Sequence, residues 1–250
     1  MEIKLENINI KINENYIFNN INLSIPTKKI IGIYGNHYID FINLLKNKEL
    51  ETGNIIDNGI LDNMLIIDDY DSFITNIVLD ELYLNIPYNQ AIEKEIIEIL
   101  KRFNLELNFL NRAINTLSNT EKKIIKLIIA MFSTSKTIFI FNLFNGLDYH
   151  LKKEFIKLIK LTKNKYYKTI FINDSNMDTI YKLLDKLLIV DTNLVAIDNL
   201  EKIFMMEEVK QTAIEYPNFI KIKLMLLDKG INIKNIKNIN DLIKEVNKDV

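Results

Sequence analysis

Apolar and polar residues alternate along the first part of the chain, at positions 3–12 and again at positions 17–25. Alternation with a period of two predicts strands with one buried face, and the short polar stretch between them predicts an antiparallel hairpin. A continuous apolar run follows at positions 29–34, and Gly35 closes it. This run predicts a buried strand, and positions 39–47 predict a short helix after it.

Gly53 and Gly59 predict a turn after this helix, and the apolar residues 65–67 predict another buried strand. An acidic loop comes next. Its carboxylates belong to Asp68, Asp69 and Asp71. Carboxylates this close together can bind a cation, but acidic loops are also common where the chain is simply solvated. We favour the solvated loop over the cation site.

The middle of the chain changes to helical periodicity, with apolar residues at i, i+3 and i+4. The predicted helices span residues 76–84, 90–103 and 120–132. Short apolar runs then alternate with helical stretches, which is typical of βαβ units and a parallel sheet. The runs lie at 137–141, 169–172 and 187–190, and the helical stretches lie at 149–161 and 179–184. The last part of the chain, from about residue 201 to residue 250, is predicted to be helical, with a break at 229–231.

Composition narrows the possible functions. The chain has 250 residues, 48% of them apolar and 26% charged, with a net charge of −1, so a basic nucleic-acid footprint is excluded. It has no cysteine, which excludes disulfides and a thiol nucleophile, and its two histidines have no partners for a zinc site. We therefore expect no metal site built by protein side chains. No signal peptide or membrane-spanning run is visible, so we expect a cytoplasmic protein.

Glycine is scarce, with 6 residues where average usage would give about 17. Gly32, in a predicted strand, and Gly35, directly after it, precede a predicted helix, which is where a phosphate-binding loop of the form GxxxxGK[ST] would lie. His37 replaces the last glycine of that pattern, Tyr38 replaces the lysine, and Ile39 replaces the hydroxyl residue. The candidate loop residues are Gly32, Gly35, Asn36, His37, Tyr38, Ile39 and Asp40.

Later motifs strengthen this interpretation. The sequence LSNTEKK begins at Leu117, the apolar run 137–141 follows, and GLD ends at Asp148. In order and spacing, these segments resemble the signature, Walker B strand and D-loop of the ATP-binding cassette family. The run 169–178 is similar to the family's switch strand. The resemblance extends from residue 3 to about residue 204.

The C-terminal region, with the segments 217–220, 229–233 and 240–246, is similar to the tail of energy-coupling-factor transporter ATPases. The resemblance implies an α/β fold of the P-loop NTPase type. Its parts would be a mixed or parallel sheet core, an N-terminal antiparallel β subdomain, a helical subdomain at about residues 75–135 and a helical C-terminal tail. The implied domain boundary separates residues 1–205 from residues 206–250.

The catalytic positions of the family are substituted. The resemblance places the magnesium-binding aspartate at Phe141, the catalytic glutamate at Asn142 and the switch histidine at Ser175. Asn119 and Thr120 replace the glycines of the signature. Phosphoryl transfer depends on positioning and on charge stabilisation, so these substitutions predict a chain that does not hydrolyse ATP. The family's cofactors are ATP and Mg²⁺, and their binding to this chain is in doubt for the same reason.

Two family residues are retained, namely Ser118 of the signature and Asp148 of the D-loop. The resemblance implies that both act in trans, on ATP bound by a partner subunit. Both also fit a structural role as helix caps, and Ser118 with Glu121 has the pattern of a capping box. Ser175 with Asp178 fits the same pattern, and we favour a cap over catalysis there.

The sequence leads to one main hypothesis. The chain is a degenerate cassette subunit of an energy-coupling-factor type importer, on the inner face of the cell membrane. It pairs with a second cassette subunit, as a hetero- or homodimer, and couples this partner to a membrane-embedded subunit. The alternatives are an active transporter ATPase with unusual motifs and a free-standing interaction protein derived from a cassette.

Overall fold

The computed structural model describes residues 1–230 except 13, 14, 71, 193 and 213, and the side chains of residues 12, 15 and 16 also lie outside the description. The polar stretch predicted to link the two strands of the hairpin therefore falls partly outside the description, and so does the last part of the tail, 231–250. No helix in the described ranges is long and apolar enough to cross a membrane.

The N-terminal part is an antiparallel sheet in the order β2-β1-β4. Strands β1 (Glu2–Ile12) and β2 (Asn15–Pro26) form the predicted hairpin. Strand β4 (Thr52–Ile56) lies where the sequence predicted a turn around Gly53. That prediction was wrong because the strand is made by pairing with distant β1. Gly53 has φ +102°, and a Cβ there would lie 2.6 Å from carbonyl oxygens of β1, so glycine is required.

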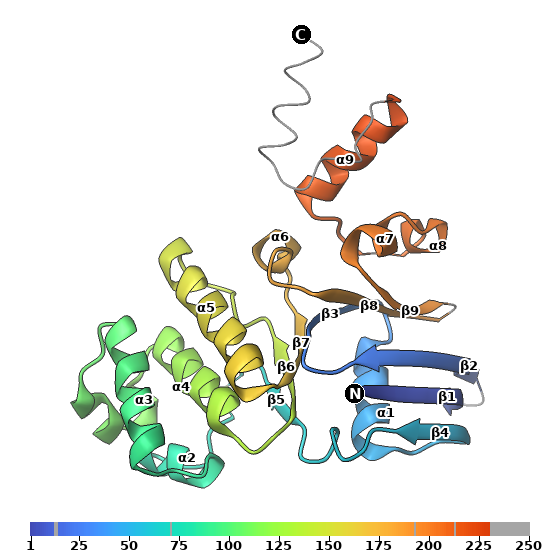
Figure 1. The fold of residues 1–250 in the computed structure, drawn as a ribbon. Helices are drawn as coiled ribbons and strands as arrows, with labels where there is room; N and C mark the ends of the chain where they lie inside the picture. The colour runs from blue at the N-terminus through green and yellow to red at the C-terminus, as the bar shows by residue number, and fades with distance from the viewer. Residues whose placement is uncertain (13–14, 71, 193, 213, 231–250) are drawn as a thin grey trace.

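The second sheet forms the centre of the molecule, in the order β5-β6-β7-β3-β8-β9 (Figure 1). Its parallel strands are β5 (Leu65–Ile67), β6 (Thr137–Phe141), β7 (Thr169–Asn173), β3 (Ile30–Tyr34) and β8 (Lys186–Asp191). Strand β9 (Leu194–Asp198) pairs antiparallel with β8 at the edge, and the sequence analysis missed it. The parallel sheet predicted from the alternating apolar runs is confirmed.

Successive residues of the central strands point to opposite faces and enter different cores. Ile138 and Ile140 of β6 belong to a core with the helical region, whereas Phe139 between them belongs to a core with the N-terminal sheet. Strand β7 repeats the pattern, and Phe139 stacks on Phe171 at a centroid distance of 4.6 Å. Helix α1 (Tyr38–Asn47) packs in the second core and α5 (Tyr149–Tyr166) in the first.

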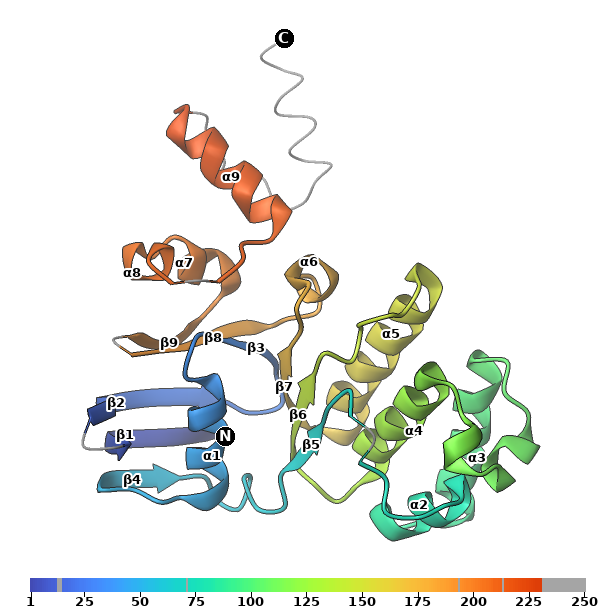
Figure 2. The ribbon, with the colours of Figure 1, turned by 180° about the vertical axis from the view of Figure 1, so that it is seen from behind.

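The helical region follows β5 in the chain and lies beyond the β5 edge of the central sheet, next to α5 (Figure 2). It consists of α2 (Val78–Asn85), α3 (Gln90–Arg102), the 3₁₀ turns η1 (Leu107–Asn111) and η2 (Ile114–Thr116), and α4 (Asn119–Phe132). The α/β fold with a mixed central sheet, an antiparallel N-terminal sheet and a helical subdomain is therefore confirmed.

The remaining helices are α6 (Met177–Ile180), α7 (Leu200–Phe204), α8 (Glu207–Lys210) and α9 (Asn218–Asp228). A third core joins Leu187 and Ile189 of β8 to Phe204, Val209 and Ile220. Residues on both sides of the predicted boundary at residue 205 thus share one core. The division into two domains stays a prediction.

Candidate functional site

The loops that follow the parallel strands gather at one edge of the central sheet. Ligands of open parallel sheets bind at this carboxyl edge, where the strand order changes direction. Gly35 follows β3, Asp68 follows β5, Asn142 follows β6 and Asp174 follows β7, while Asp191 is the last residue of β8. Segments that are far apart in the sequence therefore contribute to one candidate site.

The remnant phosphate loop lies tightly against β8. Gly35 has φ +108°, and a Cβ there would come within 2.1 Å of the carbonyl oxygen of Val190, so no other residue fits without backbone movement. The backbone N–H of His37 donates to that same carbonyl at 3.1 Å. A backbone donor that could face a phosphate is thus already used within the protein.

Two carboxylates lie at this loop. Asp191 lies 3.5 Å from both the backbone nitrogen and the side-chain amide of Asn36. Asp40 binds Nδ1 of His37 at 2.9 Å, and the Nε2 atom of the same ring lies 3.1 Å from the hydroxyl of Thr192. Negative charge therefore occupies the surroundings of the loop in which a triphosphate would need positive charge.

Tyr38 and Phe141 contact each other at the start of α1 and the end of β6. Their ring centroids are 6.0 Å apart, with an angle of 38° between the planes, and both rings pack against the core of the N-terminal sheet. The resemblance places a phosphate-binding lysine at the first position and a magnesium ligand at the second. In this chain the two positions form an aromatic pair that provides neither a cation nor a carboxylate.

Asn142 begins the loop that runs from residue 142 to 148, hereafter loop 142–148. It has φ +51°, a conformation that asparagine tolerates better than most residues, and its N–H donates to the carbonyl of Asn173 at 2.9 Å. Asn173 in turn donates from its side chain to the carbonyl of Ile33 at 2.8 Å. These amides link β6, β7 and β3 but provide no base for activating water.

Asp174, which the sequence analysis did not single out, is the buried carboxylate of this region. It is 2% exposed and accepts hydrogen bonds from the N–H groups of Phe144, at 3.2 Å, and Asn176, at 3.1 Å. Burial raises the pKa of Asp174, although these hydrogen bonds oppose the shift. The neighbouring Ser175, predicted at the switch position, is exposed. Its predicted capping role was wrong, because the side chain of Asn176 caps α6 instead.

The two retained family residues both cap helices. Ser118 and Glu121 form a complete capping box at the start of α4, with Ser118 N–H donating to Glu121 at 2.7 Å and Glu121 N–H donating to the Ser118 hydroxyl at 3.2 Å. Asp148 caps α5 by accepting a hydrogen bond from Leu151 N–H at 2.8 Å. The capping roles are confirmed, while the action of Ser118 and Asp148 on a partner's ATP stays a prediction.

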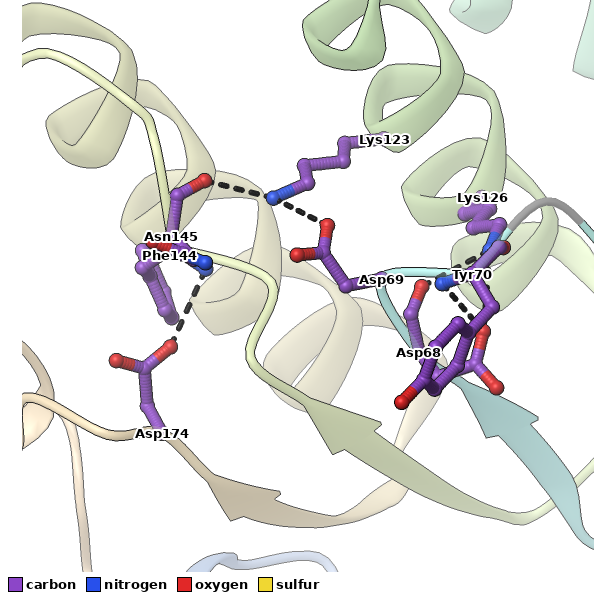
Figure 3. A network of polar contacts seen from close by, with 8 residues as sticks. All are labelled: Asp68, Asp69, Tyr70, Lys123, Lys126, Phe144, Asn145 and Asp174. Carbon is purple, nitrogen blue, oxygen red and sulfur yellow. Dashed lines mark hydrogen bonds and ion pairs between the residues drawn. The ribbon is translucent and has the colours of Figure 1, made fainter.

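Two buried lysines of α4 form the polar network in Figure 3. Lys123 pairs with Asp69 at 2.6 Å, and Lys126 pairs with Asp68 at 3.2 Å. Asp69 is exposed and Asp68 half-buried, so this part of the acidic loop is solvated as expected, but each aspartate also neutralises an ammonium group from α4. Asp71 lies outside the described residues. Lysines among the apolar positions of a predicted helix were the signal that could have revealed the network.

Within the described part of the chain, no group of three or more histidine, aspartate or glutamate side chains could hold a metal ion. The residues at the phosphate-binding position do not fit ATP and Mg²⁺ either. The backbone N–H of His37 already donates to Val190, and the carboxylates of Asp40 and Asp191 lie beside the loop. An aromatic pair fills the positions where the resemblance places the lysine and the metal ligand.

No family model matches the chain. Among curated proteins, it is similar to the energy-coupling factor transporter ATP-binding protein EcfA2 of Mycoplasma capricolum. The identity is 25% over 163 residues, which is 64% of this chain and 56% of that protein. The chain thus spans little more than half the length of this relative.

Solved structures share the fold at lower identity. The ATP-binding subunit of an ABC transporter has a TM-score of 0.69 and 14% identity, covering 90% of this chain and 100% of that chain. The protein cbiO1 from Clostridium perfringens, part of the ABC transporter complex cbiONQ, has a TM-score of 0.65 and 19% identity, covering 91% and 96%. These comparisons confirm the resemblance that the sequence motifs indicated.

Proposed function

From the premise that this chain has the fold of an ATP-binding cassette, we propose that it is a non-hydrolysing subunit of an energy-coupling-factor type importer. It pairs with a second cassette subunit that binds and hydrolyses ATP. It also contacts a membrane-embedded coupling subunit and works on the inner face of the membrane. The similarity to an energy-coupling factor transporter ATP-binding protein supports the type of transporter.

The contact between Tyr38 and Phe141 carries the proposal that the chain does not hydrolyse ATP. Transfer of a phosphoryl group needs cations at the phosphates, and removal of one such stabilising group costs about 10²–10³ in rate. Here the lysine and the metal ligand are both replaced, and Asn142 stands in the place of the base. Asp40 and Asp191 add repulsion toward a bound triphosphate.

A partner surface is supported by exposed apolar side chains around the loop after β5 and on α2. Ile74 and Tyr70 are each 78% exposed, which is unusual for large apolar residues, and Tyr83, Leu84 and Ile66 are at least 40% exposed. Groups of exposed apolar residues are typical of protein interaction sites. We assign this surface, around the loop after β5 and α2, to the membrane-embedded subunit.

The test is purification of the tagged chain from membranes of its own cells, followed by ATPase assays of the isolated chain and of the complex. The proposal predicts that a membrane protein and a second cassette co-purify, and that only the complex hydrolyses ATP. Hydrolysis by the isolated chain would support the active-ATPase alternative. Recovery of the chain without either partner would support the free-standing interaction protein.

A further inference from the structure

Helix α4 carries two lysines whose charged groups lie inside the protein, not in solvent. Lys123 is 6% exposed and Lys126 is 8% exposed. Residues three apart lie on the same face of a helix, and this face is turned toward the loops that follow β5 and β6 (Figure 3). A buried ammonium group is stable only where oxygen atoms surround it.

Lys126 has such an oxygen shell. Its ammonium donates to the backbone carbonyl of Asp68 at 2.9 Å, to the carboxylate of Asp68 at 3.2 Å, and to the carbonyl of Tyr70. The three acceptors match the three donors of an ammonium group. The ring of Phe73 adds a cation–π contact at 5.5 Å. The loop after β5 is therefore wrapped around a cation that belongs to α4.

Lys123 joins a second loop to the same helix. Its ammonium donates to the carbonyl of Asn145 at 2.7 Å and pairs with the carboxylate of Asp69 at 2.6 Å. The N–H of the adjacent Phe144 donates to Asp174, which follows β7. Loop 142–148 is thus held from two sides, by a buried lysine and by a buried aspartate.

The space between these groups is filled. The cavity lined by Asp68, Asp69, Tyr70, Asn119, Lys122, Lys123 and Lys126 has a volume of about 10 Å³. That is about the minimum that a single water molecule needs, so a phosphate group does not fit.

We infer that Lys123 and Lys126 are positioning residues that fasten α4 to the loop after β5 and to loop 142–148 without any bound ligand. The helical subdomain is consequently held against the sheet whether or not nucleotide is present. We call these contacts of Lys123 and Lys126 with the two loops the bridge, and it follows from the geometry alone. Its use rests on the proposed function: Ser118 starts the same helix and Asp148 ends loop 142–148, so the bridge would keep both ready for a partner's ATP.

Hydrogen exchange followed by mass spectrometry tests the bridge on the full chain. In the wild type, peptides covering residues 66–70 and 142–148 should exchange slowly, and millimolar Mg-ATP should not change them. Lys123→Met should speed exchange in both peptides by about tenfold or more, because a buried ionic contact closes them. Lys126→Met should act mainly on the first peptide. Peptides of β3 and β8 serve as the internal reference for an intact fold.

Lys101→Met is the matched control, since Lys101 pairs with Glu98 on the surface of α3 and its side chain is 65% exposed. It should leave both peptides unchanged. If Lys123→Met also loses protection in β3 and β8, Asp69→Asn replaces it as the test, because Asp69 lies near the surface and its amide keeps the shape. Asp69→Asn should then speed exchange in both peptides.

Two results would overturn the bridge. The first is fast exchange of both peptides in the wild type. The second is exchange at the wild-type rate in a folded Lys123→Met or, where that variant loses protection in β3 and β8, in Asp69→Asn. Slower wild-type exchange on addition of Mg-ATP, with the variants still faster than wild type, would have a different meaning. It would support the bridge and show that the chain binds nucleotide, although the residues of the loop after β3 do not fit ATP and Mg²⁺.

Discussion

Tyr38 packs against Phe141 with ring centroids 6.0 Å apart, joining the first residue of α1 to the last residue of β6. The resemblance to the ATP-binding cassette family places a cation and a metal ligand at these two positions. The aromatic pair keeps the helix and strand in contact by apolar packing. The contact between α1 and β6 is thus made by two rings that carry neither a cation nor a carboxylate.

The first prediction concerns this pair. Tyr38→Ala and Phe141→Ala should each lower the free energy of unfolding by about 1–3 kcal/mol, since both rings are only partly buried. The double variant should lose less than the sum, with a coupling of about 0.5–1.5 kcal/mol for the ring contact. Urea unfolding of the four proteins measures this coupling, and strictly additive losses would show that the rings do not stabilise each other.

The second prediction concerns Gly35. Gly35→Ala should lower the free energy of unfolding by about 3 kcal/mol or more, because it combines a positive φ with a clash against the Val190 carbonyl. Gly146→Ala is the control, since Gly146 also has a positive φ but has no atom within 4 Å of the added Cβ. It should cost only about 1–2 kcal/mol. Equal losses in denaturant titrations would mean that the close approach to β8 is absent.

The third prediction separates the two roles of Ser118. Ser118→Ala removes the side-chain half of the capping box and should cost about 1 kcal/mol, measured by urea unfolding. Ser118→Asp should keep most of the stability, because aspartate is an equally good N-cap. Its negative charge would however repel a phosphate of the partner's ATP. A complex that keeps full ATPase activity with Ser118→Asp would show that the residue acts only as a cap.

The fourth prediction concerns Lys168, a 4% exposed lysine whose ammonium donates to the carbonyls of Ala130 and Ser133 and to the hydroxyl of Ser133. Burial lowers the pKa of Lys168 from 10.5 to about 8. Between these values the unfolded chain binds more protons than the folded chain, so stability should rise with pH through this window.

Unfolding of wild type and Lys168→Met at pH 7 to 10.5 tests this effect. The stability of the wild type relative to the variant should stay flat up to about pH 8 and rise above it. The surface variant Lys101→Met should show no such relative change. A flat difference across the whole range would mean that Lys168 keeps the pKa of a solvated lysine.

The sequence predicts most of the central sheet because runs such as 137–141 and 169–172 are buried on both faces and are therefore mostly apolar. Strand β9 escaped prediction because all five of its residues are only half-buried, so no face has a clear apolar pattern. Strand β4 escaped prediction because its Gly53 is a residue typical of turns. The strand is made by pairing with β1, which is distant in the sequence.

The candidate site was predictable in position but not in its contacts. Glycine spacing located the loop, and family motifs located Phe141 and Asn142. The contacts of Asp191 with Asn36 and of Lys123 with Asp69 join residues 155 and 54 positions apart, respectively. No local pattern contains such pairings, because they arise only when the parallel strands bring their carboxyl ends to one edge.

The most direct test of the central claim is a calorimetric titration of the purified chain with Mg-ATP. With Asp40 and Asp191 at the loop and the pair Tyr38 and Phe141 in place of the cation and metal sites, the account predicts no saturable binding up to millimolar nucleotide. Saturable binding with a dissociation constant in the micromolar range, weakened by removal of Mg²⁺, would contradict it.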